Sequence, residues 1–214
     1  MAFFLHGQNR CSTNRGYSMP LKNTVEAYGS VAKFLHWITA LLFLVSYCSV
    51  YFRQWFTELG SDLNWTALQI HLSCGVSLGV IVFLRIYWRI INRNPDPEPG
   101  GYWEHRAAAI GHYSLYAVMI LLPVTGYMGT GVQTEFFAMF DIPRFADTRI
   151  FQVLIEQNLG MTFEAFEPPV DFIHKEILGA WVAWILISGH VAAAMYHHLV
   201  KKDNTVYKMT SSSS

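Results

Sequence analysis

Of the nine histidines, six in or beside long apolar stretches are the candidates for chemistry, because ionisable side chains are rare there and usually mark a functional site. They are His36, His71, His112, His174, His190 and His197. Neutral imidazole is a common metal ligand, and two imidazoles are the natural axial pair for low-spin haem b. The three cysteines form no CxxC or CxxCH motif, so neither zinc nor covalently attached haem is indicated. Haem b is therefore favoured over zinc or copper, while a proton relay through histidine, tyrosine and water stays open.

These histidines must be positioned by membrane helices. Hydrophobic residues make up 52% of the 214 residues and charged residues only 14%, against about 25% in soluble domains. About 20 apolar residues cross the hydrocarbon layer, and four blocks reach that length, namely 31–52, 67–91, 107–130 and 175–199. We predict an all-α fold, an integral membrane four-helix up-down bundle. Its parts are an N-terminal arm (1–24), the helical domain (25–209, with a long outer loop at 131–172) and a tail (210–214).

The charge distribution predicts the orientation. Eleven Lys and Arg residues lie before or near the start of the first block, at or between the adjoining ends of the second and third blocks, or after the fourth. The other two connections carry four. The positive-inside tendency then places both termini on the cytoplasmic or matrix side of a bacterial or organellar inner membrane. The formal net charge is zero, which gives no indication of a nucleic-acid partner.

Alternating helix direction sorts the histidines by depth. His36, His112 and His190 belong to the inner half, and His71 and His174 to the outer half. Two ligand levels would place two haem b groups one above the other across the membrane.

Two of these residues have equally simple structural interpretations. His36 lies near the membrane interface, where a hydrogen-bonded histidine without a ligand is common. His71 is followed by Gly75 and Gly79 on the same helix face, a row that either lets helices pack closely or leaves room for a flat macrocycle.

The outer loop 131–172 is long for a small bundle, and such loops tend to be functional. Its apolar segments EFFAMFDIP and FQVLIEQNLGMTFEAF predict short amphipathic helices on the outer membrane face. Docking of a partner is the competing hypothesis.

Four motifs resemble the bacterial cytochrome b561 family, whose best-known activity is superoxide oxidation. They are KFLHW (33–37), QIHLSCG (69–75), IGHYSLYAVMILLPVTGYM (110–128) and GHVAAAMYHHLVKKDNTVYKM (189–209), and the resemblance covers about residues 25–209. It implies two haem b groups, the inner held by His36 and His190 and the outer by His71 and His174. It leaves His112 outside the ligand set and places His197 towards a quinone site near the inner haem.

The sequence departs from the family pattern at one point. Family members usually place the two ligands of the fourth helix fourteen residues apart, whereas His174 and His190 are sixteen apart and Glu176 occupies the family position. On an α-helix sixteen residues leave the two side chains about 160° apart. A carboxylate is a poor ligand for haem b. We therefore expect a bulge or two-residue insertion near the start of the helix that lets His174 ligate.

The resemblance implies electron transfer from superoxide at the outer haem to ubiquinone near the cytoplasmic side. Lys33, His197 and Asp203 are the candidates to bind the quinone, and side chains directed at lipid headgroups are the alternative for each. Basic groups that could guide superoxide are few on the acidic outer face, namely Arg144, Arg149 and Lys175.

Two further hypotheses stay open. The chain could be a relay or anchor subunit that passes electrons between quinone and a partner respiratory complex docked on the 131–172 loop. It could also be a structural accessory of a larger respiratory assembly that has lost one haem.

Overall fold

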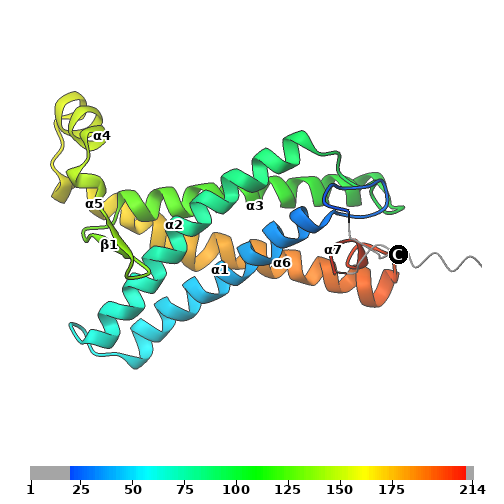
Figure 1. Cartoon of the computed structure of the whole chain (residues 1–214), viewed down its shortest axis with the longest axis horizontal. Coiled ribbons are helices and arrows are strands. Elements are labelled where there is room, and N and C mark those ends of the chain that lie inside the picture. The colour runs from blue at the N-terminus through cyan, green and yellow to red at the C-terminus, as the bar shows by residue number, and fades with distance from the viewer. Residues whose placement is uncertain (1–19, 211–214) are drawn as a thin grey trace, which may run out of the picture.

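The computed structural model describes residues 20–210. Most of the predicted N-terminal arm (1–24), and the predicted tail (210–214) except its first residue, lie outside the described residues. Four long helical segments run up and down the bundle (Figure 1): α1 (Ser30–Phe56), α2 (Asp62–Ile91), α3 (Tyr102–Met128) and a composite fourth segment. All four are long and apolar enough to cross a membrane. The predicted all-α membrane four-helix bundle is confirmed.

The fourth segment changes its helical form along its length. It consists of α5 (Phe163–Phe172), the π-helix η3 (Ile173–Val182), α6 (Ala183–Tyr196) and the π-helical turn η4 (His197–Lys201). Pro168 and Pro169 lie inside α5. A π-helix bonds residue i to i+5, is rare, and is found mostly at functional sites.

The bundle presents apolar side chains outward, as expected of helices in lipid. Phe34, Leu44 and Phe83 are 63%, 61% and 66% exposed. Because exposed apolar surface of this extent is unfavourable in water, the bilayer is the environment that the helices require.

The interior contacts join the fourth segment to α1 and α3. Val118 and Leu122 of α3 pack on Leu178 and Ala183, with Tyr47 of α1 against them. The Tyr47 hydroxyl donates to the carbonyl of Gly179 at 2.8 Å. This bond holds η3 against α1.

One end of the bundle, here called the cap end, carries the connection between α3 and α5, here called the cap (Figure 1). The cap comprises strands β1 (Thr134–Phe136) and β2 (Phe140–Ile142), the turn η1 (Phe145–Asp147), α4 (Arg149–Phe151) and the π-helical η2 (Gln152–Gln157). In the cap, β1 lies near α2 and α4 projects beyond the bundle (Figure 1). Phe145, Phe151, Ile155 and Phe166 form the small core of the cap. Short helices are therefore present in the second apolar segment of the loop.

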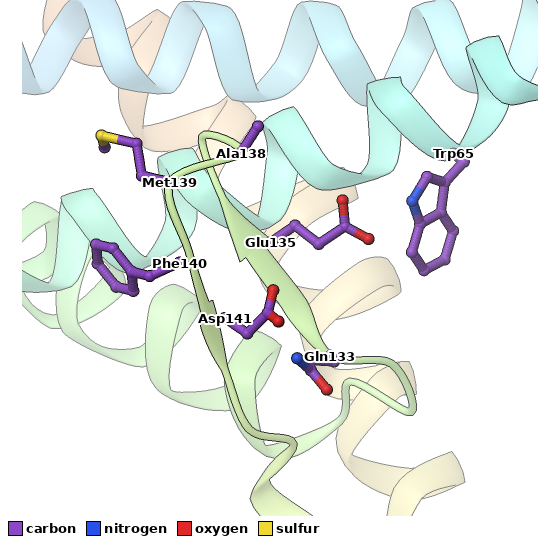
Figure 2. Close-up of a pocket in the computed structure, with 7 residues that line it drawn as sticks. All are labelled: Trp65, Gln133, Glu135, Ala138, Met139, Phe140 and Asp141. Atoms are coloured by element: carbon purple, nitrogen blue, oxygen red, sulfur yellow. The ribbon is translucent and has the colours of Figure 1, made fainter.

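The prediction of a helix for EFFAMFDIP is wrong, because this segment forms an antiparallel hairpin. Thr134 pairs with Ile142 and Phe136 with Phe140. Figure 2 shows the two strands of the hairpin side by side, next to α2. Phe137 and Ala138 at its turn both have positive φ, 45° and 57°, which matches a tight hairpin turn and not a helix. Gln69 of α2 anchors the hairpin: its Nε2 donates to the Gln133 carbonyl, and its Oε1 accepts from Glu135 N.

The opposite end, the termini end, brings both ends of the described chain together with the α2–α3 connection (Figure 1). Asp96 N donates to the carbonyl of Val25, and Tyr28 N donates to that of Lys208. Lys208 also forms an ion pair with Glu98 at 2.5 Å. This end also carries α7 (Tyr207–Thr210).

Candidate functional site

Four of the predicted histidines form two pairs at two levels of the bundle. The cap-end pair is His71 of α2 with His174 of η3, whose ring centroids are 6.1 Å apart at an interplanar angle of 69°. The termini-end pair is His36 of α1 with His190 of α6, at 6.2 Å and 56°. All four rings are partly buried. The fold thus brings two imidazole rings from distant parts of the sequence next to each other at each of two levels.

The separation within each pair suits an iron porphyrin held between the two rings. An iron–nitrogen bond of about 2 Å on each side, with a ring radius of about 1.2 Å, puts the centroids of two axial imidazoles roughly 6.3 Å apart. The observed 6.1 and 6.2 Å match this value. The residues from 20 to 210 contain no group of three or more His, Cys, Asp or Glu placed to hold a metal ion. Haem needs only two protein ligands because the macrocycle supplies four nitrogens.

The cap-end rings are oriented by hydrogen bonds at Nδ1. The Nδ1 of His174 lies 3.1 Å from the carbonyl oxygen of Leu122 and 3.3 Å from the hydroxyl of Thr125. The Nδ1 of His71 lies 2.9 Å from the Ser46 hydroxyl and 3.3 Å from the Ser46 carbonyl oxygen. A carbonyl acceptor places the proton on Nδ1 and leaves the Nε2 lone pair free for a metal, as in most histidine metal sites. Both rings are thus prepared to ligate through Nε2.

The π-helix η3 lies where the sequence analysis expects a bulge. It covers His174 and ends at Val182, eight residues before His190. A π-turn advances by about 82° per residue instead of about 100°, so the net offset over the sixteen residues falls from about 160° to about 20°. His174 and His190 therefore lie on nearly the same face despite the longer interval. Glu176, at the family position, is exposed.

Glycines leave the space beside the cap-end pair. A Cβ on Gly126 of α3 would lie 2.8 Å from Cε1 of His174, so only glycine fits beneath the ring. A Cβ on Gly79 would touch Pro123 at 3.6 Å, whereas one on Gly75 would meet nothing within 4 Å. Gly79 therefore serves helix packing, and the open space at Gly75 supports room for a macrocycle next to His71.

The termini-end pair has a third histidine beside it. His112 of α3 contacts His190, with ring centroids 5.8 Å apart at 65°. Arg85 of α2 approaches the other side of the cluster, its Nη2 lying 3.5 Å from Nδ1 of His36. All four helical segments thus contribute a side chain at this level. Arg85 was missed in the sequence analysis, although an arginine inside an apolar span is itself a signal of a site.

The proposed quinone residues divide into two groups. His197 Nδ1 lies 2.5 Å from Oδ2 of Asp203 and 3.3 Å from the Thr205 hydroxyl. Burial acts to raise the pKa of Asp203, but hydrogen bonds from His197 and Thr205 outweigh it and lower the pKa to about 2. Lys33 is buried in α1, close in sequence to His36. The structure joins His197 to Asp203.

Two of the basic candidates for guiding superoxide are already paired. Arg144 bonds Asp147 through two nitrogens at 2.7 and 2.8 Å, and this raises the pKa of the arginine and lowers that of Asp147. Lys175 pairs with Asp171 at 2.7 Å. Arg149 has no ion pair within the described residues.

A four-helix membrane bundle with two facing imidazole pairs defines a class, the membrane cytochromes of b type. Comparison with known proteins narrows it further. The family profile described as "Prokaryotic cytochrome b561" matches residues 27–212, and the chain belongs to this family. Membership implies haem b binding and electron transfer in the membrane.

Three relatives cover between 82% and 92% of the chain. The chain is 28% identical over 184 residues to "Cytochrome b561 homolog 1" of Escherichia coli K12, covering 82% of this chain and 92% of the relative. It is 27% identical over 205 residues to "Cytochrome b561 homolog 2" of the same organism, covering 92% and 97%. It is also 27% identical over 178 residues to "Probable superoxide oxidase CybB" of Yersinia pestis, covering 82% and 90%.

Proposed function

We propose that this chain binds two haem b groups and transfers single electrons from superoxide at the cap end to ubiquinone at the termini end. The proposal rests on two histidine pairs at two levels of one bundle, whose ring centroids are 6.1 and 6.2 Å apart. Haem b, when bound, supplies a one-electron redox centre at each level. The reaction balances as two superoxide anions, one quinone and two protons giving two dioxygen molecules and one quinol.

The protein residues have distinct parts in this scheme. His71 and His174 hold the cap-end haem, and His36 and His190 hold the other, with His112 outside the ligand set. The carbonyls of Ser46 and Leu122 keep the cap-end Nε2 atoms free to ligate. The apolar spans exclude water from both levels, which favours single-electron exchange over side reactions.

At the termini end, His197 delivers protons to a bound quinone in this scheme. Asp203 holds its Nδ1, which fixes the orientation of the imidazole ring. Lys33, buried one turn before His36, is the proposed cation for the quinone oxygen. With the termini in the cytoplasm, protons for quinol formation enter from that side.

Superoxide as the donor is supported by the relationship to the probable superoxide oxidase of Yersinia pestis. The structure contributes one basic group without an ion partner among the described residues of the cap, Arg149, and this makes it the proposed guide for the anion.

The first test is a dithionite-minus-air spectrum together with a haem count per purified chain. We expect a b-type spectrum and two haems. The second test is superoxide-driven reduction of ubiquinone by the isolated protein, with the His174→Ala variant as the control. Reduction that is equally fast in wild type and variant would refute the assigned route.

A relay subunit is the second candidate function, and the surface of the cap favours it. Ile150, Leu154 and Leu159 are 60%, 53% and 62% exposed there, a surface on which a partner respiratory complex could dock. Two intact haems without superoxide-driven activity would support this function. A count of one haem would instead support the structural accessory.

A further inference from the structure

We infer that Arg85 and Arg89 form a cationic clamp that binds the propionate carboxylates of the termini-end haem and raises its reduction potential. The inference rests on the proposed haem at His36 and His190. Both arginines belong to α2 and are one helical turn apart. Their guanidinium carbons lie 5.6 Å and 5.2 Å from the centre of the Tyr116 ring, so the two cations converge on one side chain of α3.

Among the described residues, neither arginine has an anionic partner. The ion pairs between residues 20 and 210 involve Arg93, Arg144, Lys175, His197, Lys201 and Lys208, and neither Arg85 nor Arg89. Arginine stays charged in proteins, and an unpaired cation inside a membrane segment is costly. The indole nitrogen of Trp88, on the same turn of α2, is also buried without a hydrogen-bond partner among these residues. Within residues 20–210, this region therefore lacks an anion for the two arginines and an acceptor for the Trp88 indole.

Haem ligation would also remove the polar contact that Arg85 makes with His36. Arg85 Nη2 lies 3.5 Å from Nδ1 of His36, and an arginine can only donate to a nitrogen lone pair. A His36 that ligates through Nε2 carries its proton on Nδ1 and has no lone pair there. The contact then becomes one between two donors, and Arg85 must turn to another acceptor.

The Nδ1 contacts of the cap-end pair differ from that of His36. There the Nδ1 atoms face carbonyl oxygens of Ser46 and Leu122, so that ligation leaves their contacts intact.

Haem b carries two propionates, which equal the two arginines in number and oppose them in charge. Planar guanidinium groups bind carboxylates through two hydrogen bonds at once.

The test uses the His174→Ala background, in which only the termini-end haem should remain, and measures its midpoint by optical redox titration. A positive charge next to the propionates favours the reduced iron, because reduction adds a negative charge. We expect Arg85→Gln to lower the equilibrium constant for reduction about tenfold, which is about 59 mV for one electron. Arg85→Lys should keep the potential near that of the parent. Arg89→Gln should shift it in the same direction by a smaller amount, because Arg89 is more exposed.

Arg93→Gln is the matched control. Arg93 follows the same helix, but it is exposed and already paired with Asp96 at 2.9 Å, so its removal should leave the midpoint unchanged. Equal midpoints for Arg85→Gln and the parent, with haem retained, would overturn the clamp. Loss of haem in Arg85→Gln but not in Arg85→Lys would support it, whereas loss in both would indicate a packing role and overturn it.

The outcome separates the two proposals. A parent that retains no haem after the His174→Ala change, or a wild-type protein with no b-type spectrum, contradicts the proposed function itself. If the parent retains one haem, and the midpoint of that haem is the same after Arg85→Gln and after Arg89→Gln, only the clamp is contradicted.

Discussion

Replacing Gly126 by alanine should remove the cap-end haem selectively. The new Cβ would lie 2.8 Å from Cε1 and 3.2 Å from Nδ1 of His174. Carbon atoms in contact are normally about 3.5–4.0 Å apart, so the ring must retreat by about 0.7–1.2 Å. The ring is held by Leu122 and Thr125 at 3.1 and 3.3 Å. A retreat of this size therefore stretches both bonds and displaces Nε2.

The expected loss of haem affinity follows from how little displacement a ligating side chain tolerates. A ligand must stay within about 0.5 Å of its productive position, and disturbing the partners that orient a metal-bound histidine typically costs about 10–100-fold in affinity. We expect the purified Gly126→Ala protein to contain one haem per chain and to keep the spectrum of the termini-end haem. Haem quantification and redox difference spectra provide the measurement.

Gly111→Ala is the matched control for this prediction. Gly111 lies in the same helix, but a Cβ there meets nothing within 4 Å. Both substitutions gain about 0.5–1 kcal/mol from the lower entropy of the unfolded chain, so a difference between them reports the contact with His174. Two haems and an unaltered spectrum in Gly126→Ala would refute the position, and hence the role, that we assign to His174.

Three further predictions concern other parts of the molecule. His174→Ala should lose one haem while Glu176→Ala keeps both, because Glu176 is exposed; loss of haem in the Glu176 variant alone would reverse the assignment. Gln69→Ala removes both bonds that anchor the hairpin and should weaken its docking by about 2–4 kcal/mol. Limited proteolysis at the hairpin should therefore be faster than in Gln133→Ala, which retains the backbone acceptor. Asp203→Asn should lower the melting temperature in detergent above about pH 4, and the difference from wild type should shrink as the pH falls towards 2. The sign follows because the folded pKa of about 2 lies below the ordinary aspartate value of 3.8, so the ionised carboxylate stabilises the fold at higher pH. A difference that does not change between pH 2 and 6 would contradict this role.

Much of the fold could be predicted from the sequence because membrane helices are specified locally. Apolar length alone defines a span, and all four predicted spans are present as helices. Alternation of direction then sorts the histidines by depth, and the structure places His71 with His174 and His36 with His190. The candidate ligands, histidines within or beside the apolar spans, could likewise be identified from the sequence.

Other features could not be predicted because they depend on contacts between distant segments. The hairpin in the outer loop exists because Gln69 and Ser73 of α2 bind its backbone, and periodicity within the loop carries no information on that anchor. Likewise, the convergence of Arg85 and Arg89 on Tyr116 requires the packing of α2 against α3.

The sequence by itself determined which residues could bind a cofactor, how many helices cross the membrane and at what depth each histidine lies. It could state that sixteen residues between His174 and His190 do not fit an α-helix with both side chains on one face, but not how the chain accommodates them. Only the tertiary structure decided that a ten-residue π-helix does so. The physical reason is that a π-helix is locally unfavourable and is held in place by contacts from other helices, such as the hydrogen bond from Tyr47 of α1 to the Gly179 carbonyl.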